Sequence, residues 1–498
     1  MELFLEGFQL LFNFQSIFII LGGVVLGLIF GSIPGLTATM AVAICLPITF
    51  GMDPSNGMAL LMGLYIGGVS GGMIPAILLN LPGTPSSIST TFDGYPMAQN
   101  GQAGRALGLS IIASFTGGLI SIIVLILLSP PLARVALEFG PFEYFAITMF
   151  ALTLISSLSD GSLVKGVIAA LLGLTFSFVG AAPIDSYPRW TFGMENLSAG
   201  FQLLPVLIGI FAVSEMLKVI EERKDNPIES KDTKDKTTKV DLPFAAIFKK
   251  PYNFIRSTLL GVGIGILPGI GGGTANIIAY VTAKRQSKTP EKFGKGIDDG
   301  VVASESSNNA AVGGALVPLI SLGIPGDTVT AMLLGGLMIH GIQSGPLLFE
   351  NNGPLVYSIF VALLIANVFM AILLISGMKG FVKLLSIPKH YLYPVIIVLC
   401  VVGSIGVNNR IFDAGALIFF GVIGYLLIKA KFPITPIILG FILGPIAEVN
   451  LRRGLQMTGG DFMPFITQPI AAAFWIIAIG SVIFSLYKDY KNTKKMTT

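Results

Sequence analysis

Runs of apolar residues long enough to cross a lipid bilayer recur along this chain, and they constrain its fold more than any other feature. A helix needs about 20 apolar residues to cross the hydrocarbon core, and runs near or above this length occur at 107–129, 162–180, 355–377, 411–428 and 469–486. Charged residues make up only 12% of the sequence, against about 25% in ordinary soluble domains. The sequence therefore predicts an all-α polytopic membrane protein, surrounded by lipid, with roughly 10–12 membrane segments.

The composition gives no support for a nucleic-acid surface, a metal centre or a disulfide. The formal charge is only +4. Cys45 and Cys400 both lie in apolar runs, where a cysteine usually acts as a small core residue. His340 and His390 are the only histidines, too few for a histidine-rich metal site. We expect no resident cofactor or metal and no nucleic-acid partner.

A highly charged segment divides the chain. Residues 219–251 are rich in both lysine and acidic residues, and lysines near membrane ends indicate the cytoplasmic side. We interpret 1–218 as a first membrane repeat, 219–251 as a cytoplasmic linker and 252–450 as a second membrane repeat. Residues 451–498 are expected to form an additional C-terminal transmembrane helix and a basic cytoplasmic tail.

The two flanks of this linker contain matching Pro-Gly motifs. Pro34-Gly35 matches Pro268-Gly269, and Pro82-Gly83 matches Pro325-Gly326. The first pair of motifs is 234 residues apart and the second pair 243 residues apart. Ordered matches at a nearly constant offset indicate a duplicated unit.

The loops after the first motif of each copy differ sharply in charge. Residues 50–56 contain no lysine or arginine, whereas residues 284–296 contain five. Because basic loops favour the cytoplasmic side, the two loops are expected on opposite faces, as in an inverted repeat. The N-terminus has no positive charge near it and is expected outside. Arg452 and Arg453 argue against an inverted repeat, because inversion would place these two basic residues outside the cytoplasm.

Proline and glycine in an apolar run would break a membrane helix. In hydrocarbon such breaks persist only against protein or a water-filled cavity, so we expect broken helices or re-entrant hairpins at 16–49 and 252–283. Helix N-termini exposed at the breaks can bind anions. Inverted repeats with discontinuous helices that meet near the midplane are typical of secondary transporters.

Polar residues beside the breaks are the candidate site. The expected substrate-binding residues are Pro34, Gly35, Thr37, Thr39, Asn80, Pro82, Gly83, Thr84, Ser86, Ser87, Pro268, Gly269, Gly271, Gly272, Gly273, Thr274, Asn276, Ser307, Asn308, Pro325, Gly326 and Thr328. Glu305, Asn309 and Asp327 are expected to couple Na⁺ or H⁺, since hard cations prefer oxygen ligands. Alternatively, Glu305 caps a helix near the interface, and small residues serve only close helix packing.

Several of these stretches resemble a known family. "LYIGGVSGGMIPAILLNLPGTPSSISTTFDGYPMAQNGQAGRALG" (64–108), "LPGIGGGTANIIAY" (267–280) and "GVVASESSNNAAVGGALVPLISLGIPGD" (300–327) resemble the large permease subunit of tripartite tricarboxylate transporters, the TctA family. The resemblance implies a bacterial inner-membrane, multi-pass permease that takes up organic carboxylates. It further implies a small four-helix membrane subunit, a periplasmic solute-binding protein and an ion gradient in place of ATP.

Two motifs or properties of the chain suggest functions of other classes. Ile324-Pro325-Gly326-Asp327 suggests an intramembrane aspartyl protease, but the required glycine is replaced by Ile324 and a partner Tyr-Asp motif is missing, so we expect no enzyme. A stand-alone channel or exporter for small anions is the alternative. Which carboxylate is carried, and whether the motion is elevator-like or rocking, stay open at this point.

Overall fold

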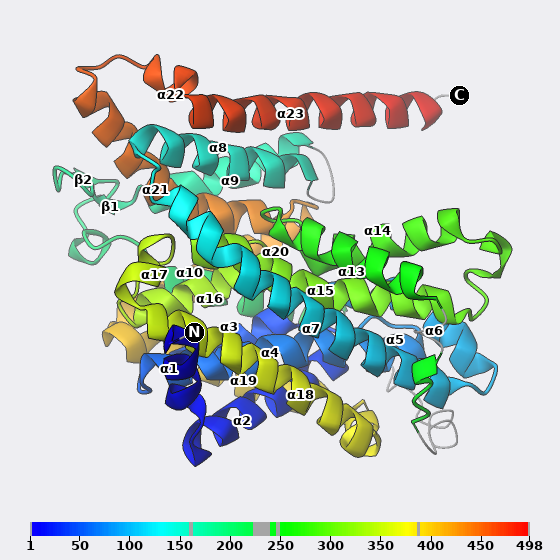
Figure 1. The fold of residues 1–498 in the computed structure, drawn as a ribbon. Coiled ribbons are helices and arrows are strands. Elements are labelled where there is room, and N and C mark those ends of the chain that lie inside the picture. Colours follow the sequence, from blue (N-terminus) through cyan, green and yellow to red (C-terminus); the bar gives the residue numbers. More distant parts are fainter. Residues whose placement is uncertain (1, 159–162, 223–239, 246–249, 386–388, 497–498) are drawn as a thin grey trace. The chain divides into compact units, whose positions relative to one another are not determined.

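The computed structural model describes residues 2–158, 163–222, 240–245, 250–385 and 389–496, and these are almost entirely helical (Figure 1). Among them, helices long and apolar enough to cross a membrane occur at Phe14–Ser32, Pro54–Leu79, Ala103–Ala136, Leu203–Glu221, Gly353–Leu384, Ile411–Lys429 and Ile434–Met457. Shorter apolar helices of 10–17 residues accompany them. The all-α polytopic prediction is confirmed. Most of the predicted linker, residues 223–239 and 246–249, lies outside the described residues.

The chain divides into two compact units that do not follow the two halves of the sequence. Unit 1 is Met1–Ala133 with Val219–Gly403, and unit 2 is Arg134–Lys218 with Ser404–Thr498. Each unit therefore combines a segment from each half. The two-repeat division at the linker stays a prediction.

Unit 1 is built from helices of both halves. They are α1 (Glu2–Leu11), α2 (Phe14–Ser32), α3 (Ala38–Thr49), α4 (Pro54–Gly71), α5 (Met73–Leu79), η1 (Pro85–Ser87), α6 (Thr90–Gln99), most of α7 (Ala103–Ala136), α13 (Pro251–Ile266), α14 (Gly271–Gln286), η5 (Pro290–Lys292), α15 (Asp298–Leu322), α16 (Thr328–Ile339), α17 (Leu347–Asn351), α18 (Gly353–Leu384) and most of α19 (Lys389–Asn408).

Unit 2 contains the remaining elements. They are α8 (Pro141–Leu158), α9 (Leu163–Ser177), β1 (Gly180–Ala181), β2 (Pro188–Arg189), η2 (Glu195–Leu197), α10 (Leu203–Ile208), the π-helical turn η3 (Gly209–Val213), part of α11 (Ser214–Glu222), α20 (Ile411–Lys429), α21 (Ile434–Met457), α22 (Pro464–Thr467) and α23 (Pro469–Met496). Helices α8 and α9 pack on α21, and α23 packs on α8 (Figure 1). The indole of Trp475 on α23 donates to Phe465 O at 3.0 Å and helps to hold this helix in place.

Small residues let helices of unit 1 pack backbone against backbone. Helix α2 packs on α4, and α13 packs on α15. On α13, a Cβ added to Gly261 would lie 2.3 Å from Ser307 O, closer than any side chain tolerates, whereas one added to Gly263 would meet nothing within 4 Å. The expected small-residue packing of membrane helices is therefore present, alongside the breaks.

Gly261→Ala is expected to lower the free energy of unfolding by about 2 kcal/mol, because the methyl group would force α13 away from α15. Gly263→Ala, two residues away on the same helix, is the matched control and should leave stability unchanged or slightly raised. Thermal unfolding of the purified protein in detergent measures both. Equal effects of the two substitutions would contradict the close-packing explanation.

The membrane helices break where the Pro-Gly motifs predict. Helix α2 ends at Ser32 and α3 begins at Ala38, and α13 ends at Ile266 and α14 begins at Gly271. Between them, Gly35 has a φ of 92° and Gly269 a φ of 79°. Only glycine adopts this left-handed region without strain, so these two glycines allow the chain to turn between the arms.

Candidate functional site at the helix breaks

All four Pro-Gly elements lie in unit 1, and contacts join them both within the second sequence half and between the two halves. The Gly269 N–H donates to Gly326 O at 2.8 Å, which joins the third element to the fourth. The hydroxyls of Thr39 and Thr328 are hydrogen-bonded at 2.9 Å, which joins the first element to the fourth. The predicted site is therefore assembled from both halves.

The second and fourth elements fit into matching surroundings. A Cβ on Gly83 would lie 2.2 Å from Gly31 O and 2.7 Å from Gly72 Cα. A Cβ on Gly326 would lie 2.8 Å from Gly265 O and 2.6 Å from Ala315 Cα, and these residues stand at the sequence offsets of the two motif pairs. Equivalent residues of the two halves thus make equivalent contacts.

Asn80 has a structural function that its sequence position did not reveal. It is the exposed C-cap of α5 in the left-handed conformation, with a φ of 57°. Gly323 takes the same conformation at the end of α15, with a φ of 75°. In both places the residue after the cap donates its backbone N–H to the carbonyl of a proline five residues before the cap. These bonds are Leu81 N–H to Pro75 O and Ile324 N–H to Pro318 O. Asparagine and glycine are the usual residues at such caps.

Two substitutions at Asn80 distinguish a function as helix cap from a function as substrate ligand. If Asn80 acts only as the cap, Asn80→Gly should leave transport and stability unchanged, whereas Asn80→Ala should lower stability by about 1 kcal/mol, because alanine is strained in this conformation. If its amide binds substrate, both substitutions should reduce uptake equally. Uptake and thermal unfolding measured on the two variants decide between these functions.

Asn308 is a buried polar side chain near the breaks, and it lies beside the carboxylate of Glu305. It is 1% exposed, and neither Nδ2 nor Oδ1 makes a hydrogen bond within the described part of the chain. A Cβ on Gly272 would lie 3.2 Å from Asn308 Oδ1 and 3.1 Å from Ser86 Cβ. Asn308 therefore lies beside the first turn of α14, whose N-terminus has no side-chain cap. A buried amide without a partner is costly, so the side chain of Asn308 is available to bind a further group.

Glu305 lies one turn before Asn308 on α15 and is completely buried. Its carboxylate accepts hydrogen bonds from Thr90 Oγ1 at 2.5 Å and from Ser114 Oγ at 2.9 Å. Glu305 lies inside α15, whose N-cap is Ile297, so it does not cap its own helix. Asn309 is next in this group, and its Oδ1 accepts a hydrogen bond from Ser70 Oγ at 2.7 Å. The neighbourhood is rich in oxygen atoms, which hard cations prefer.

Asp327 forms hydrogen bonds with residues from both halves of the sequence. It is the N-cap of α16 and accepts a hydrogen bond from the Thr330 N–H at 2.7 Å. Its other carboxylate oxygen accepts from Tyr65 Oη at 2.6 Å. These bonds use much of the carboxylate, so Asp327 has fewer free positions for a cation than Glu305. Within the described residues, no group of three His, Cys, Asp or Glu could hold a metal ion.

Asn276 joins the second half to the first. Its Oδ1 accepts hydrogen bonds from the Ser89 N–H at 2.8 Å and from the Ser89 hydroxyl. Its Nδ2 donates to Ser304 O at 3.3 Å. This amide is therefore occupied by the protein itself, unlike that of Asn308.

Asp93, one helical turn after Ser89, forms further hydrogen bonds between the two halves of the sequence. Its carboxylate accepts hydrogen bonds from Tyr280 Oη at 2.9 Å and from the N–H groups of Gly294, Gly296 and Ile297 at 2.8–3.1 Å. Several residues of this polar network are not among the predicted site residues: Asp93, Ser89, Thr90, Tyr65, Ser70, Ser114 and Tyr280. The polar cluster "STTFD" at 89–93, next to the second Pro-Gly motif, is the signal that could have indicated three of them.

The remaining predicted residues line the breaks themselves. Thr37 caps α3 and accepts a hydrogen bond from the Met40 N–H at 3.2 Å. Thr84, Ser86 and Ser87 bond to one another around η1. Ser307 bonds back to Ser304 O within α15. The other positions lie in the turns or in the first turn of α14: Pro34, Pro82, Pro268, Gly271, Gly273, Thr274 and Pro325.

Comparison with known proteins identifies relatives over most of the chain. The sequence model of the family described as "Tripartite tricarboxylate transporter TctA family" matches residues 17–439. A protein of Agrobacterium vitis described as "Uncharacterized 52.8 kDa protein in TAR-I ttuC' 3'region" is 36% identical over 478 residues, which are 95% of this chain and 93% of the relative. A second, "Uncharacterized protein in TAR-II ttuC' 3'region" from the same organism, is 36% identical over 231 residues, 46% of this chain and 96% of the relative. No solved structure matches the chain.

Proposed function

Because this chain belongs to the tripartite tricarboxylate transporter TctA family, we propose that it is the permease subunit of a secondary uptake system for organic carboxylates. In this proposal it lies in the bacterial inner membrane and works with a small four-helix membrane subunit. A periplasmic solute-binding protein delivers the substrate. An Na⁺ or H⁺ gradient supplies the driving force, and no cofactor is needed.

One observation carries the proposal of a carboxylate site. The unpaired amide of Asn308 lies beside Gly272, in the uncapped first turn of α14, and close to Ser86. Helix N-termini and neutral donors bind anions through N–H and O–H groups. A site of this kind can hold a carboxylate and release it again, because no buried ion pair has to be broken.

Glu305 with Asn309 is the proposed cation-coupling pair. Both are buried on α15, within one turn of Asn308. A cation or proton bound there would lower the cost of placing an anionic substrate next to a buried carboxylate. Coupling follows, because neither ligand binds well without the other.

Matching contacts in the two halves support the inverted repeat. Helices η1 and α6 of the first half pack on α14 and α15, while α16 of the second half packs on α3 and α4. Such an exchange is expected when two copies of one unit face each other across a pseudo-two-fold axis. Arg452, which argued against inversion, forms ion pairs with Glu448 and Asp185, so its charge is balanced on whichever face it lies.

The buried hydrogen bonds between the halves favour motion of unit 1 as one block. Opening the site by separating the halves would break the bonds of Asn276, Glu305 and Asp327 to first-half residues. Each broken buried bond costs about 1–3 kcal/mol. We therefore favour alternating access in which both halves of the site move together.

The proposal is tested by uptake of radiolabelled citrate, succinate and benzoate into proteoliposomes that contain this protein and the small subunit, with and without the binding protein. Saturable uptake that needs both an imposed Na⁺ or H⁺ gradient and the binding protein is the expected result. Flux without the binding protein or a gradient would instead favour the stand-alone channel or exporter. The genes that neighbour this one would identify the binding protein to use.

A further inference from the structure

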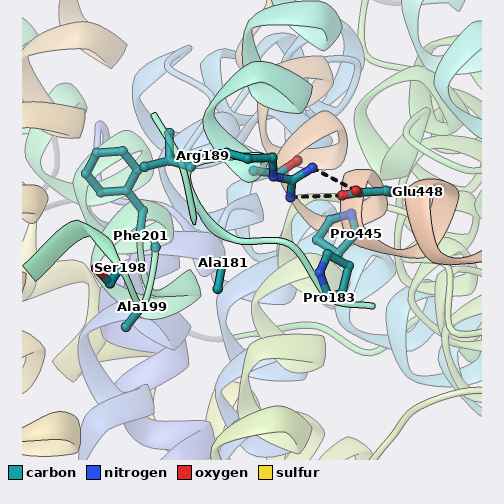
Figure 2. A pocket seen from close by; sticks show the side chains of 11 residues that line it. Ala181, Pro183, Arg189, Ser198, Ala199, Phe201, Pro445 and Glu448 are labelled. Atoms are coloured by element: carbon teal, nitrogen blue, oxygen red, sulfur yellow. Dashed lines mark hydrogen bonds and ion pairs between the residues drawn. The ribbon is translucent and has the colours of Figure 1, made fainter. Parts of the chain in front are cut away.

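A second polar site lies in unit 2, in a cavity of about 260 Å³ between the loop that follows α9 and helix α21 (Figure 2). Its lining includes Arg189 of β2, Glu448 and Pro445 of α21, and the serines Ser177 and Ser198. At about 30 Å³ per water molecule, this volume suits a small organic acid. It is below the size of a typical drug-binding pocket, about 300–1,000 Å³.

Glu448 is held by two guanidinium groups. Arg189 binds it end-on through both terminal nitrogens, with Nη1–Oε1 at 2.7 Å and Nη2–Oε2 at 3.1 Å (Figure 2). Arg452 binds the same carboxylate through Nε at 2.9 Å and also reaches Asp185 at 3.0 Å. The Asp185 side chain is 53% exposed, so water screens its charge. Near the cavity, two cations therefore face two anions, one buried and one exposed.

Arg189 retains an unused edge. A guanidinium has five N–H donors arranged in a fixed plane, and the end-on pair with Glu448 leaves the edge formed by Nε and one Nη free for a second acceptor. Nε is buried and has no hydrogen-bond partner among the described residues. The ring of Phe178 covers the guanidinium, with Cζ 5.4 Å from the ring centroid, and this holds the side chain in place.

We propose that this cavity binds a small carboxylate, which accepts hydrogen bonds from the free edge of Arg189. Arginine is well suited to this task, because the spacing of its donors matches the two oxygens of a carboxylate. Ser177 and Ser198 line the same cavity and can add hydroxyl contacts. This site is distinct from the one at the helix breaks, to which its residues do not belong.

The membrane topology gives the second site its function, and here the inference rests on the proposed function. The apolar stretch Leu203–Glu221 leads from the loop that lines the cavity to the charged linker. With the linker in the cytoplasm, the cavity lies toward the outer face. A carboxylate arriving from outside would be captured there, so the site should set the apparent affinity and not the maximal rate.

Arg189→Gln and Arg452→Gln form a matched pair. Each removes one cation and leaves Glu448 paired with the other arginine, but only Arg189 lines the cavity. In the uptake assay, Arg189→Gln should raise KM at least about 10-fold with little change in Vmax, because a charge-assisted pair is lost. Arg452→Gln should change KM less than about two-fold. Arg189→Lys, which keeps the charge but loses the planar fork, should resemble Arg189→Gln.

Direct binding of citrate, succinate and benzoate to the purified protein separates this inference from the proposed function. In an Asn308→Ala background, calorimetry should still detect binding of one of these acids at millimolar concentration, lost with Arg189→Gln and kept with Arg452→Gln. Equal behaviour of the two arginine variants, or no binding in this background, would overturn the second site. Absence of gradient-driven uptake by the unmodified protein, with Arg189-dependent binding intact, would overturn only the proposed function.

Discussion

Glu305→Gln is expected to reduce gradient-driven carboxylate uptake by at least about 100-fold while the protein stays folded. The loss of even an indirect contact at a cation site costs on the order of 10–100-fold in affinity, and Glu305 would be a direct ligand or the proton carrier. Folding should survive, because the hydroxyls of Thr90 and Ser114 can rotate to pair with an amide as they do with the carboxylate. The measurement is the initial rate of uptake in proteoliposomes with an imposed Na⁺ or H⁺ gradient.

Glu143→Gln is the matched control, since Glu143 is also a buried glutamate but belongs to unit 2 and caps the Gly140 N–H at 2.9 Å. It should leave uptake close to that of the unmodified protein. If Glu305→Gln transports at the normal rate with the same dependence on the gradient, Glu305 does not couple the cation. Thermal unfolding shows whether a loss of uptake is only a loss of folded protein.

Asn308→Ala is expected to reduce uptake by roughly 10- to 100-fold without lowering stability. A hydrogen bond to a charged ligand contributes about 1.5–3 kcal/mol, and every 1.4 kcal/mol is tenfold in affinity. The amide of Asn308 makes no short hydrogen bond in the described structure. Its polar neighbour there is the Glu305 carboxylate, which keeps the hydrogen bonds of Thr90 and Ser114 when the amide is removed. The melting temperature should therefore be unchanged or raised, while uptake falls.

Asn276→Ala is the comparison for this prediction, because it removes the same amide from a helix of the same unit. Its loss would leave the buried Ser89 N–H without the acceptor it now has, which costs about 1–3 kcal/mol. We expect Asn276→Ala to lower the melting temperature and Asn308→Ala not to. The same loss of stability in both variants, or normal uptake in Asn308→Ala, would remove Asn308 from the substrate site.

The positions of the helix breaks followed from local chemistry and could be read from the sequence. Proline removes a backbone donor and clashes with the preceding turn, and glycine supplies the left-handed turn, so the ends of α2 and α13 were predictable from Pro34-Gly35 and Pro268-Gly269. The apolar runs likewise predicted the membrane helices, since hydrocarbon length sets the length of a spanning helix.

Which polar side chains are free was not predictable, because it depends on partners distant in sequence. Asn276 and Asn308 are both asparagines beside a break, but Ser89, from the other half of the chain, occupies the first and nothing within the described residues occupies the second. Asn80 is also a predicted ligand, and only the structure shows that its backbone forms the left-handed cap of α5. The local sequence shows that such residues are polar and close to a helix break, but it does not determine which hydrogen bonds they form.

The sequence by itself determined the class of protein, the breaks and the family resemblance, because hydropathy, helix-breaking residues and motif spacing act over short stretches of chain. Tertiary structure alone decided that the four breaks meet in one unit and that Glu305 is buried among hydroxyls. It alone also placed Arg189 against Glu448 beside a cavity. These features arise from contacts between residues about 190 to 290 positions apart, and only packing of the whole chain establishes such contacts.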